Sequence, residues 1–410
     1  MARGLGFVVL PSILTIACSQ RESFQLSNSA AESVDIPQTE IKDQGRIGLC
    51  WSYATIAFVE SLLIQKNIHL DFSEEALGFY RIAEFLFQTV KTLPSTESEF
   101  LSVVNNLRID ETGWVLYPPG AESRPENFGI HDGIHLILNY GLVPESVWSF
   151  KFSDKISKRH FFANIQSALF RFVNDVAAQK RTWSSVSFDE LIDRVMVGDG
   201  RFPTKPPTEF EFNGRLVKPT NFVVGIQQQL SHLVSLVGGN NNFEPDFDKI
   251  VAATKNSLAA GVPVPIGFSM SIARIHKDTF SGEGLKLLNS SETYSGSTLP
   301  ADNVISNFAS DGGHMMLAVD FMNVGGKMGS ISPDELAREV AKPASDLEFL
   351  KLRNSWGIGD RNTDWGFPVA SSADGFYKVD KQYLIGAIRV AGVNSKYVPL
   401  AIVVDKKFVP

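Results

Sequence analysis

The chain has 410 residues, a formal net charge of −7 and 44% hydrophobic residues, so it contains ample material for a globular core. At about 100–200 residues per domain, this length predicts two or three domains or one elaborated pair of lobes. The acidic balance and the absence of a long basic run argue against a nucleic-acid partner. Beyond the N-terminal apolar run, no stretch of about 18 apolar residues follows that could span a bilayer.

The N-terminus has the pattern of an export signal. A short positively charged start precedes the apolar residues 5–16, and the small residues Thr15 and Ala17 precede Cys18. Ala17-Cys18 after an apolar run is similar to a bacterial lipoprotein cleavage site, although Thr15 stands where such sites usually carry leucine. We therefore expect a signal peptide at residues 1–17 and lipidation of Cys18, which would anchor an exported protein at a membrane, in the periplasm or at the surface. Ordinary secretion after cleavage at Ala17 is the alternative.

The rest of the chain divides into a tether and two lobes. Residues 18–35 are rich in Ser, Gln, Glu and Ala without a strong period, which is typical of a flexible tether. The Gly-, Asn- and Asp-rich segment 238–248 is the expected boundary between the lobes. Residues 36–245 are predicted to be mainly helical and residues 246–410 rich in strands. This order of helices followed by strands indicates an α+β protein.

The stretch from Gln44 to Cys50 begins the first helix of the helical lobe. Two glycines between them permit a tight loop of unusual backbone angles. The apolar residues that follow predict one buried stripe on a helix that runs to about residue 66: Trp51, Ala54, Phe58 and Leu62. Cys50 would then lie in the first turn, where the positive end of the helix dipole favours the nucleophilic thiolate. Gln44 and the backbone N–H of Cys50 could converge on a developing oxyanion, although a lone cysteine on a helix is more commonly a small buried hydrophobe.

Further helices follow from start and stop signals. Ser73 with Glu74 and Glu75 behind it predicts the start of a second helix. A short helix is predicted at 132–140 and should end at Gly141. The other elements expected in this lobe are two helices and one loop rich in Gly and Pro: residues 161–178, 188–197 and 198–219.

The second lobe should open with a helix at 248–260 and a strand at 262–270. Residues 281–301 are rich in Ser, Gly and Thr and predict a long loop. Short apolar segments after it predict the remaining strands: residues 315–321, 347–353, 375–379, 387–390 and 401–404.

Two polar positions in this lobe could complete a catalytic group with Cys50. His314 opens a predicted strand beside two glycines, where it is well placed to act as a base towards a thiol. On that strand, Met315 points to the face opposite His314 because side chains alternate. Asn354 ends a later strand, and its amide could hold one tautomer of the His314 ring while Trp356 shields that bond from water.

Together, Gln-x5-Cys-Trp, Gly-His and Asn-Ser-Trp-Gly, in this order, resemble the papain superfamily of cysteine peptidases. The resemblance runs from about residue 36 to the end of the chain. It implies a papain-like two-lobe fold, with a helical N-terminal lobe, a β-barrel-like C-terminal lobe and the active-site cleft between them. It also implies the following site: Cys50 as nucleophile, His314 as base, Asn354 as the residue that orients His314, Gln44 as oxyanion donor, and Trp51 and Trp356 as supporting residues.

Several features differ from the papain and cathepsin type. Leu49 precedes the nucleophile, and the chain has only two cysteines, so the disulfides common in secreted members cannot form. His314 and Asn354 lie 264 and 304 residues after Cys50, against about 130–150 in that type. In these respects, and in segments 140–147 and 402–410, the chain resembles the bleomycin hydrolase and aminopeptidase C branch, which carries large insertions. The 40 residues from His314 to Asn354 are long for either type.

The resemblance implies a cysteine peptidase that acts on peptide or protein substrates and needs no cofactor or metal. One alternative is a degenerate papain-like fold used for binding, against which the intact Gln–Cys–His–Asn set argues. Another is a cell-wall hydrolase or acyl transferase with a Cys–His pair, against which the Asn-Ser-Trp-Gly segment and the chain length argue. His131 and His135 are spaced for one helix face, but they lack the His-Glu-x-x-His pattern and a third ligand, so a structural role is expected.

The expected cleavage mode is endopeptidase. In the bleomycin hydrolase branch, a C-terminal tail places its carboxylate in the cleft, where it meets the free amine of the substrate and makes those enzymes aminopeptidases. This chain stops at Pro410, where the preceding segment is still predicted to be a strand. A carboxylate from the loop 281–301, Glu283 or Glu292, could stand in for the missing group, which keeps the aminopeptidase alternative open.

Overall fold

The computed structural model describes twelve ranges besides Val34: residues 36–45, 48–91, 108–109, 116–117, 130–151, 158–237, 243–276, 278–283, 312–326, 331–358, 372–393 and 400–410. The expected signal peptide, Cys18 and the tether up to residue 33 lie outside these residues, as does most of the expected loop 281–301. Within the described ranges, no helix combines the length and the apolar character that crossing a membrane requires.

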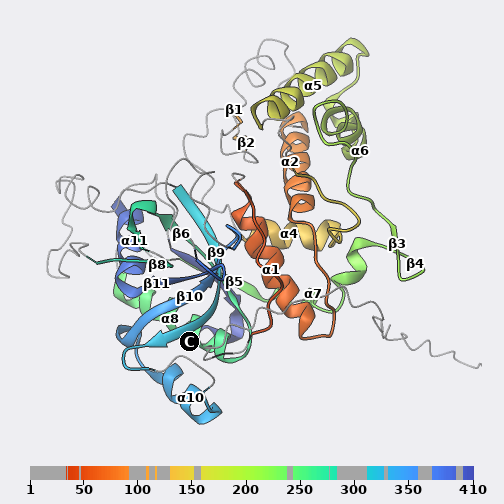
Figure 1. Cartoon of the computed structure of the whole chain (residues 1–410). Helices are drawn as coiled ribbons and strands as arrows, with labels where there is room; N and C mark the ends of the chain where they lie inside the picture. Colours follow the sequence, from red (N-terminus) through yellow and green to blue (C-terminus); the bar gives the residue numbers. More distant parts are fainter. Residues whose placement is uncertain are drawn as a thin grey trace, which may run out of the picture.

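Helices and one large sheet pack together around a single central helix, α1, at Cys50–Ile64. Figure 1 shows α1 between the sheet and the remaining helices of the N-terminal part. One side of α1 contacts strands of the sheet and the other side contacts α2 and α4. This mixture of helices and a sheet confirms the predicted α+β class.

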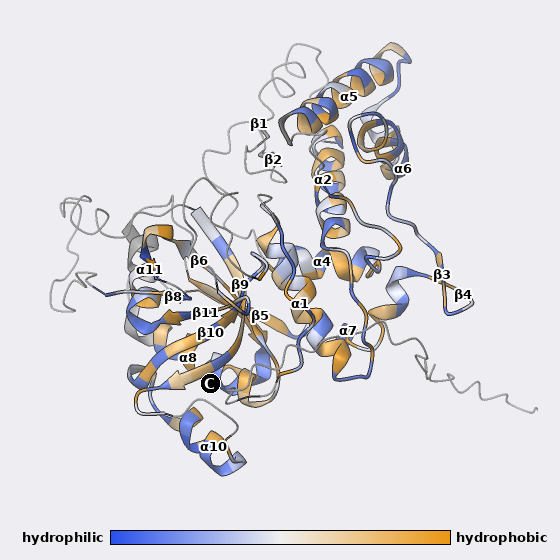
Figure 2. Cartoon of the chain, viewed as in Figure 1, coloured by the Kyte–Doolittle hydropathy of each residue, from blue (hydrophilic) through white to orange (hydrophobic). Residues whose placement is uncertain are grey.

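The four residues of the predicted apolar stripe on α1 are buried, and burial extends beyond the stripe to every face of the helix. All residues from Trp51 to Ile64 are buried, including the polar Ser52, Thr55 and Glu60. Figure 2 shows how hydrophobic residues run along α1 and the central strands. A helix that is covered all round needs no polar face, so its apolar residues do not follow a single stripe.

The helices around α1 begin and end close to the predicted signals. In α2 (Glu74–Lys91), the hydroxyl of Ser73 accepts from the backbone N–H of Ala76 at 3.2 Å, so it caps the first turn. In α4 (Ile130–Tyr140), the helix ends as predicted at Gly141, which has φ +81°. The other helices of this region are a long one, a short one that continues into a π-helical turn, and a single turn: α5 at Lys158–Ala178, α6 at Phe188–Leu191 with the turn at Ile192–Met196, and α7 at Gln227–Ser231.

The segment predicted as a loop at 198–219 contains a hairpin of β3 (Phe210–Phe212) and β4 (Arg215–Val217). Its rings pack against Phe222, with centroids 6.2 Å away for Phe210 and 5.5 Å for Phe212. Strands of three residues carry too little alternation to be recognised in a stretch rich in Gly and Pro. A second short pair, β1 (Arg108–Ile109) with β2 (Leu116–Tyr117), was also not predicted.

The large sheet has eight strands in the order β5-β12-β6-β9-β10-β11-β8-β7. All neighbours are antiparallel except β11 and β8. Its strands, in chain order, have these bounds: β5 Leu233–Val237, β6 Val264–Met270, β7 Ile275–His276, β8 Thr279–Phe280, β9 Gly312–Asn323, β10 Leu347–Arg353, β11 Phe376–Asp380 and β12 Ala401–Asp405.

Helices α8 (Phe243–Ala259) and α11 (Lys381–Val393) pack against the sheet and against each other, while α1 packs on β9 and β6. The alternation predicted for β9 places Leu317 and Val319 in the core shared with α1, and Met316 in the core shared with α8 and α11. The sheet is therefore covered by helices on both faces.

The structure shows three features of this lobe that the sequence did not predict. Residues 387–390, predicted as a strand, belong to α11, whose start is capped by Asp380 accepting from the N–H of Tyr383 at 2.6 Å. Strand β5 lies before the expected division at 245 yet pairs with β12 along its whole length. Helix α10 (Pro333–Ala341), which was not predicted, occupies much of the long connection between His314 and Asn354.

The close approach of α4 to α1 should be sensitive to one methyl group. A Cβ on Gly133 would lie 2.5 Å from Oγ1 and 2.7 Å from Cγ2 of Thr55, whose hydroxyl is already bonded to the carbonyl of Trp51. We expect Gly133→Ala to lower the free energy of unfolding by about 1–2 kcal/mol, because overpacking outweighs the gain in helix propensity. Chemical denaturation measures this, with Gly225→Ala as the control, since its Cβ would meet only Lys66 at 3.7 Å. Equal stability of the two variants would contradict the tight contact.

Candidate active site

Cys50 is the first residue of α1 and is partly exposed. Burial raises the pKa of its thiol, and hydrogen bonds from the backbone of Met315, Trp51 and Cys50 itself lower it only in part. The expected shift towards thiolate at the helix start is therefore outweighed by desolvation. The contact with Met315 also joins the start of α1 to β9, the strand that carries His314.

His314 lies near the start of β9, opposite Phe268 of β6, and is only 5% exposed. Its Nε2 lies 2.8 Å from Oδ1 of Asn354, and the ring of Trp356 stacks on it with centroids 4.8 Å apart and planes inclined by 21°. Because Oδ1 only accepts, Nε2 must carry the proton, which leaves Nδ1 of the neutral ring as an acceptor. Burial lowers the pKa of His314 to about 4, and the bond to Asn354 opposes this only in part.

Asn354 follows the last residue of β10 and is held on both sides. Its backbone N–H donates to the carbonyl of Gly375 at 3.1 Å. Its Oδ1 also accepts from the N–H of Ser355 at 2.8 Å, so two donors fix which way the amide points. Among the described residues, the buried Nδ2 has no hydrogen-bond partner. The side chain is thus anchored through its oxygen, which is the atom that faces His314.

Gln44 reaches the same place from the N-terminal side of α1. Its N–H donates to the carbonyl of Ser355 at 2.8 Å, and its Oε1 accepts from the hydroxyl of Ser355. The neighbouring Asp43 forms a β-bridge with Trp356, and Gly45 follows with φ +59°, a conformation that favours glycine. Because Ser355 takes the amide oxygen, the NH₂ end of Gln44 carries the donors that an oxyanion needs.

The residues predicted for the site are thus linked by contacts in the described structure, Trp51 through its backbone hydrogen bond to Cys50 and the others through Met315, Asn354 and Ser355. Trp356 covers His314, whereas Trp51 is buried in the core around α1. Sequence reasoning missed the roles of Ser355 and of the Met315 backbone. Ser355 lies inside the Asn-Ser-Trp-Gly motif, which was the available signal, but a backbone contact such as that of Met315 leaves no trace in residue type.

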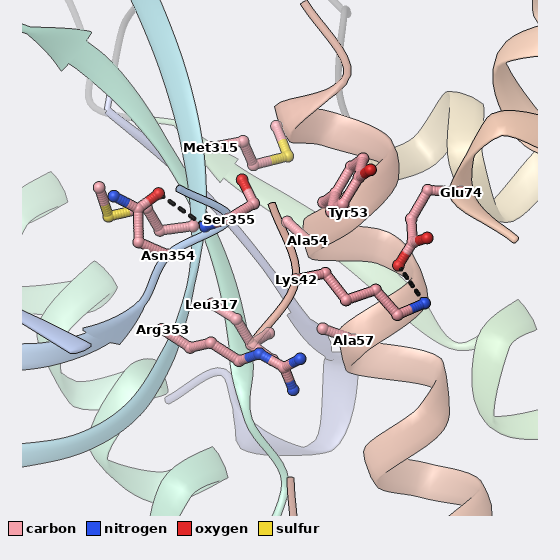
Figure 3. Close-up of a pocket in the computed structure, with 11 residues that line it drawn as sticks. Lys42, Tyr53, Ala54, Ala57, Glu74, Met315, Leu317, Arg353, Asn354 and Ser355 are labelled. Carbon is pink, nitrogen blue, oxygen red and sulfur yellow. Dashed lines mark hydrogen bonds and ion pairs between the residues drawn. The ribbon is translucent and has the colours of Figure 1, made fainter. Parts of the chain in front are cut away.

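A cavity of about 20 Å³ lies directly behind this group. It has room for about one water molecule. Figure 3 shows it between the end of β10, with Asn354 and Ser355, and the side chains of Tyr53, Lys42 and Glu74. The catalytic candidates are therefore backed by a buried, charged region instead of a purely apolar core.

The two histidines considered as metal ligands face different partners. His131 contacts the hydroxyl of Ser235 at 2.5 Å, and His135 lies 3.5 Å from Glu84 and 2.9 Å from the amide of Asn139. Over the ranges that the structure describes, no three His, Cys, Asp or Glu side chains are grouped so as to hold a metal ion.

Comparison with known proteins gives the fold of the chain. No family model matches it, and neither does any curated protein. Among solved structures, PepW from Lactobacillus rhamnosis HN001 matches with a TM-score of 0.50 and 15% identity, over 94% of this chain and 83% of that one. Xylellain, a cysteine protease from Xylella fastidiosa, matches with a TM-score of 0.33 and 15% identity over 93% and 90% of the two chains. Digestive procathepsin L 3 of the Tenebrio molitor larval midgut gives 0.29 and 14%, over 93% and 70%.

The identities are too low to transfer an activity, and of these three structures PepW is close enough to compare folds. The chain therefore shares its fold with PepW.

The lowered pKa of His314 predicts activity that persists in acid. A base must be neutral to accept a proton, and burial lowers the pKa of His314 to about 4, so kcat/KM should fall to half only near pH 4. The measurement is the pH profile of peptide cleavage between pH 3 and 8. In Trp356→Ala, water should reach the ring and move this limb upward towards the ordinary histidine value of about 6.5. A limb near 6.5 in the unmodified protein would show that burial does not control the base.

Proposed function

We propose that the protein is a papain-like cysteine peptidase that cleaves peptide bonds with Cys50, His314 and Asn354. The observation that carries the proposal is the His314–Asn354 bond of 2.8 Å under the ring of Trp356, on a strand whose next residue contacts the Cys50 thiol. This arrangement places a buried histidine, held by an amide oxygen, beside a thiol at a helix start. It suits acyl transfer better than it suits a purely structural role.

In the proposed reaction, Nδ1 of His314 takes the proton of the Cys50 thiol as Sγ attacks the scissile carbonyl carbon. The tetrahedral intermediate collapses, the C–N bond breaks, and His314 gives the same proton to the leaving amine. A thioester between Cys50 and the acyl part of the substrate remains. Water, deprotonated by His314, then attacks the thioester and releases the acid and the thiol.

Gln44 and the N–H of Cys50 would stabilise the oxyanion of both intermediates. The amide of Gln44 is turned by its bond to Ser355, so its NH₂ group needs no reorganisation during the reaction. Asn354 keeps the proton of His314 on Nε2 and leaves Nδ1 for the thiol. Each residue thus has one role that its contacts already favour.

The first test removes these groups one at a time. Cys50→Ala should lower kcat by about 10⁴-fold or more, and His314→Ala nearly as much, because each removes a group that no neighbour replaces. Asn354→Ala should be milder by one to two orders of magnitude, since an orienting residue contributes less than the base that it holds. Hydrolysis of a peptide library is the assay, and His276→Ala, an exposed position on β7, is the matched control.

Retained peptidase activity in a clean Cys50→Ala preparation would overturn the proposal. A binding protein with a degenerate papain-like fold would instead fail to react with an epoxide-type thiol inhibitor, which an active site should accept at Cys50. Activity on peptidoglycan but not on peptides would favour the cell-wall hydrolase.

We further infer endopeptidase cleavage. The last described residues are bound to the end of α7 and to α8: the N–H of Lys406 donates to the carbonyl of His232 at 3.0 Å, and the amide of Asn256 on α8 donates to the carbonyl of Phe408 at 3.1 Å. Figure 1 places this end beside α8 and α10. We therefore do not expect the carboxyl groups of residues 401–410 to bind a substrate amine at Cys50.

Two substrates of one sequence, one with a free N-terminus and one acetylated, decide the cleavage mode. We expect both to be cut at the same internal bond with similar kcat/KM, because the carboxyl groups of residues 401–410 are not expected to pair with the substrate amine. Mass spectrometry of the products identifies the bond. Stepwise loss of residues from the free peptide alone would establish an aminopeptidase. In that case Glu283, whose N–H is bonded to the hydroxyl of Ser281, becomes the first carboxylate to test; Glu292 lies outside the described residues.

A further inference from the structure

Four carboxyl groups surround the ammonium of Lys42. Glu74 lies 2.8 Å from Nζ, Glu145 3.4 Å and Glu60 3.9 Å, and Asp71 is in direct contact with it. The carbonyl of Phe72 accepts from the same nitrogen at 2.8 Å. We call these five residues, Lys42 and its four carboxyl partners, the Lys42 cluster. Its members come from the N-terminal segment, α1, the start of α2 and the turn after α4, so it joins four separate parts of the chain.

Carboxyl groups outnumber cations here even when the wider surroundings are counted. Tyr53 of α1 faces Glu74 and Glu145 of the cluster. At the start of α2, Glu75 accepts from the Tyr53 hydroxyl at 3.2 Å. Among the described residues, two further cations lie nearby: Lys151, 3.2 Å from Glu145, and the buried Arg353 of β10. Arg353 donates hydrogen bonds to the neutral groups of Gln38, Thr39 and the Glu40 carbonyl.

The backbone after Lys42 is fixed from the opposite direction, by the end of β10. The carbonyl of Lys42 accepts from the N–H of Gly357 at 3.1 Å, and the N–H of Gln44 donates to the carbonyl of Ser355 at 2.8 Å. The side chain of Lys42 therefore holds this segment to α1 and α2, while its backbone is held to the sheet. Gln44 stands two residues further along, between these two attachments. Figure 3 shows Lys42 and Glu74 paired on one side of the cavity, with Asn354 and Ser355 on the other.

We propose that Lys42 is a positioning residue for the oxyanion donor Gln44, and that the surplus of carboxylates around it makes this positioning depend on pH. The inference rests on the proposed peptidase function for its activity readout. The cluster holds the backbone of Gln44 best when some of its carboxyl groups are protonated. When all are ionised, their mutual repulsion within a few ångströms of one ammonium loosens the segment.

The direction of the pH effect follows from the cluster's own titration. Burial raises the pKa of Glu74 well above its ordinary value, and Glu60 and Glu75 raise it further while Lys42 opposes them. Burial likewise raises the pKa of Glu60. A group with a raised folded-state pKa contributes stability that is fully present below its unfolded pKa of about 4.3 and is lost as pH rises through the folded pKa. The pKa of Asp71 is raised as well, whereas that of Glu145 is lowered, so three of the four carboxyl groups make the cluster tighter in mild acid than in alkali.

A double-mutant cycle tests the positioning role. Gln44→Ala should lower kcat by about 10²–10³-fold through loss of an oxyanion donor, and Lys42→Met should lower it by about tenfold in the unmodified background. In the Gln44→Ala background, Lys42→Met should change kcat less than twofold, because the residue through which it acts is gone. The substrate is the acetylated peptide at pH 6, and Lys218→Met, an exposed lysine on the hairpin side, is the control. A tenfold loss in both backgrounds would show a merely structural role and overturn the proposal.

Glu74→Gln tests the pH dependence while leaving Lys42 in place. This variant keeps a side-chain oxygen for Lys42 and stands for the protonated carboxyl group. The unfolding midpoint of the unmodified protein should fall between pH 5 and 8.5, and Glu74→Gln should remove part of that fall, so that it is the more stable protein at pH 8.5. Its kcat should also decline less above pH 7, a difference that disappears in the Gln44→Ala background. Glu211→Gln, on the exposed hairpin, is the control.

Equal pH slopes of the unfolding midpoint in Glu74→Gln and the unmodified protein would overturn the proposal, even if Lys42→Met fails to fold. If the unmodified protein cleaves no peptide at any pH, the proposed function fails instead. The unfolding measurements still decide on the cluster in that case, because they do not require activity.

Discussion

The packing of α1 against β9 is the contact on which the rest of the site depends. It sets the start of one helix beside the start of one strand, so that Cys50 meets the backbone of Met315 one residue after His314. Without this packing, Cys50 on α1 and His314 on β9 would not lie close to each other. Leu317 and Val319 extend the same contact into the core around α1, which makes the relative position of the two candidates a property of close packing.

The sequence predicted the parts of this arrangement that depend on residue type and local signals. Ser73 predicted the start of α2, Gly141 the end of α4, and the alternation in β9 the two faces of that strand. The four polar residues of the candidate site were predicted from motifs in which the residue types themselves indicate the chemistry: Gln44, Cys50, His314 and Asn354. What the sequence predicted wrongly depends on tertiary context. The strand expected at 387–390 is helical because Tyr383, Leu384 and Ala387 bury one face of α11 against the sheet.

Two features needed the structure for different reasons. Helix α10 has a local signal in the sequence, because Ser332 and Glu335 form a capping box around Pro333. This signal was not used in the sequence analysis. Strand β5 gave no such sign. Its five residues become a strand because β12 pairs with them from Ala401 to Asp405, more than 160 positions further along the chain. Pairing over such distances cannot be derived from a local pattern.

The same burial that orders the site also fixes its electrostatic state. His314, Asn354 and Gln44 are each at most 5% exposed, so their orientations come from protein groups and not from water. The cost of this order is that burial disfavours the charged forms of both Cys50 and His314, raising one pKa and lowering the other. In the proposed peptidase, these shifts favour a neutral thiol beside a neutral base before substrate binds. Charge would then develop only as the proton moves, when the donors of Gln44 and the Cys50 N–H meet the oxyanion. Such a site would stabilise its ground state little, so that more of the interaction energy would be available to the transition state.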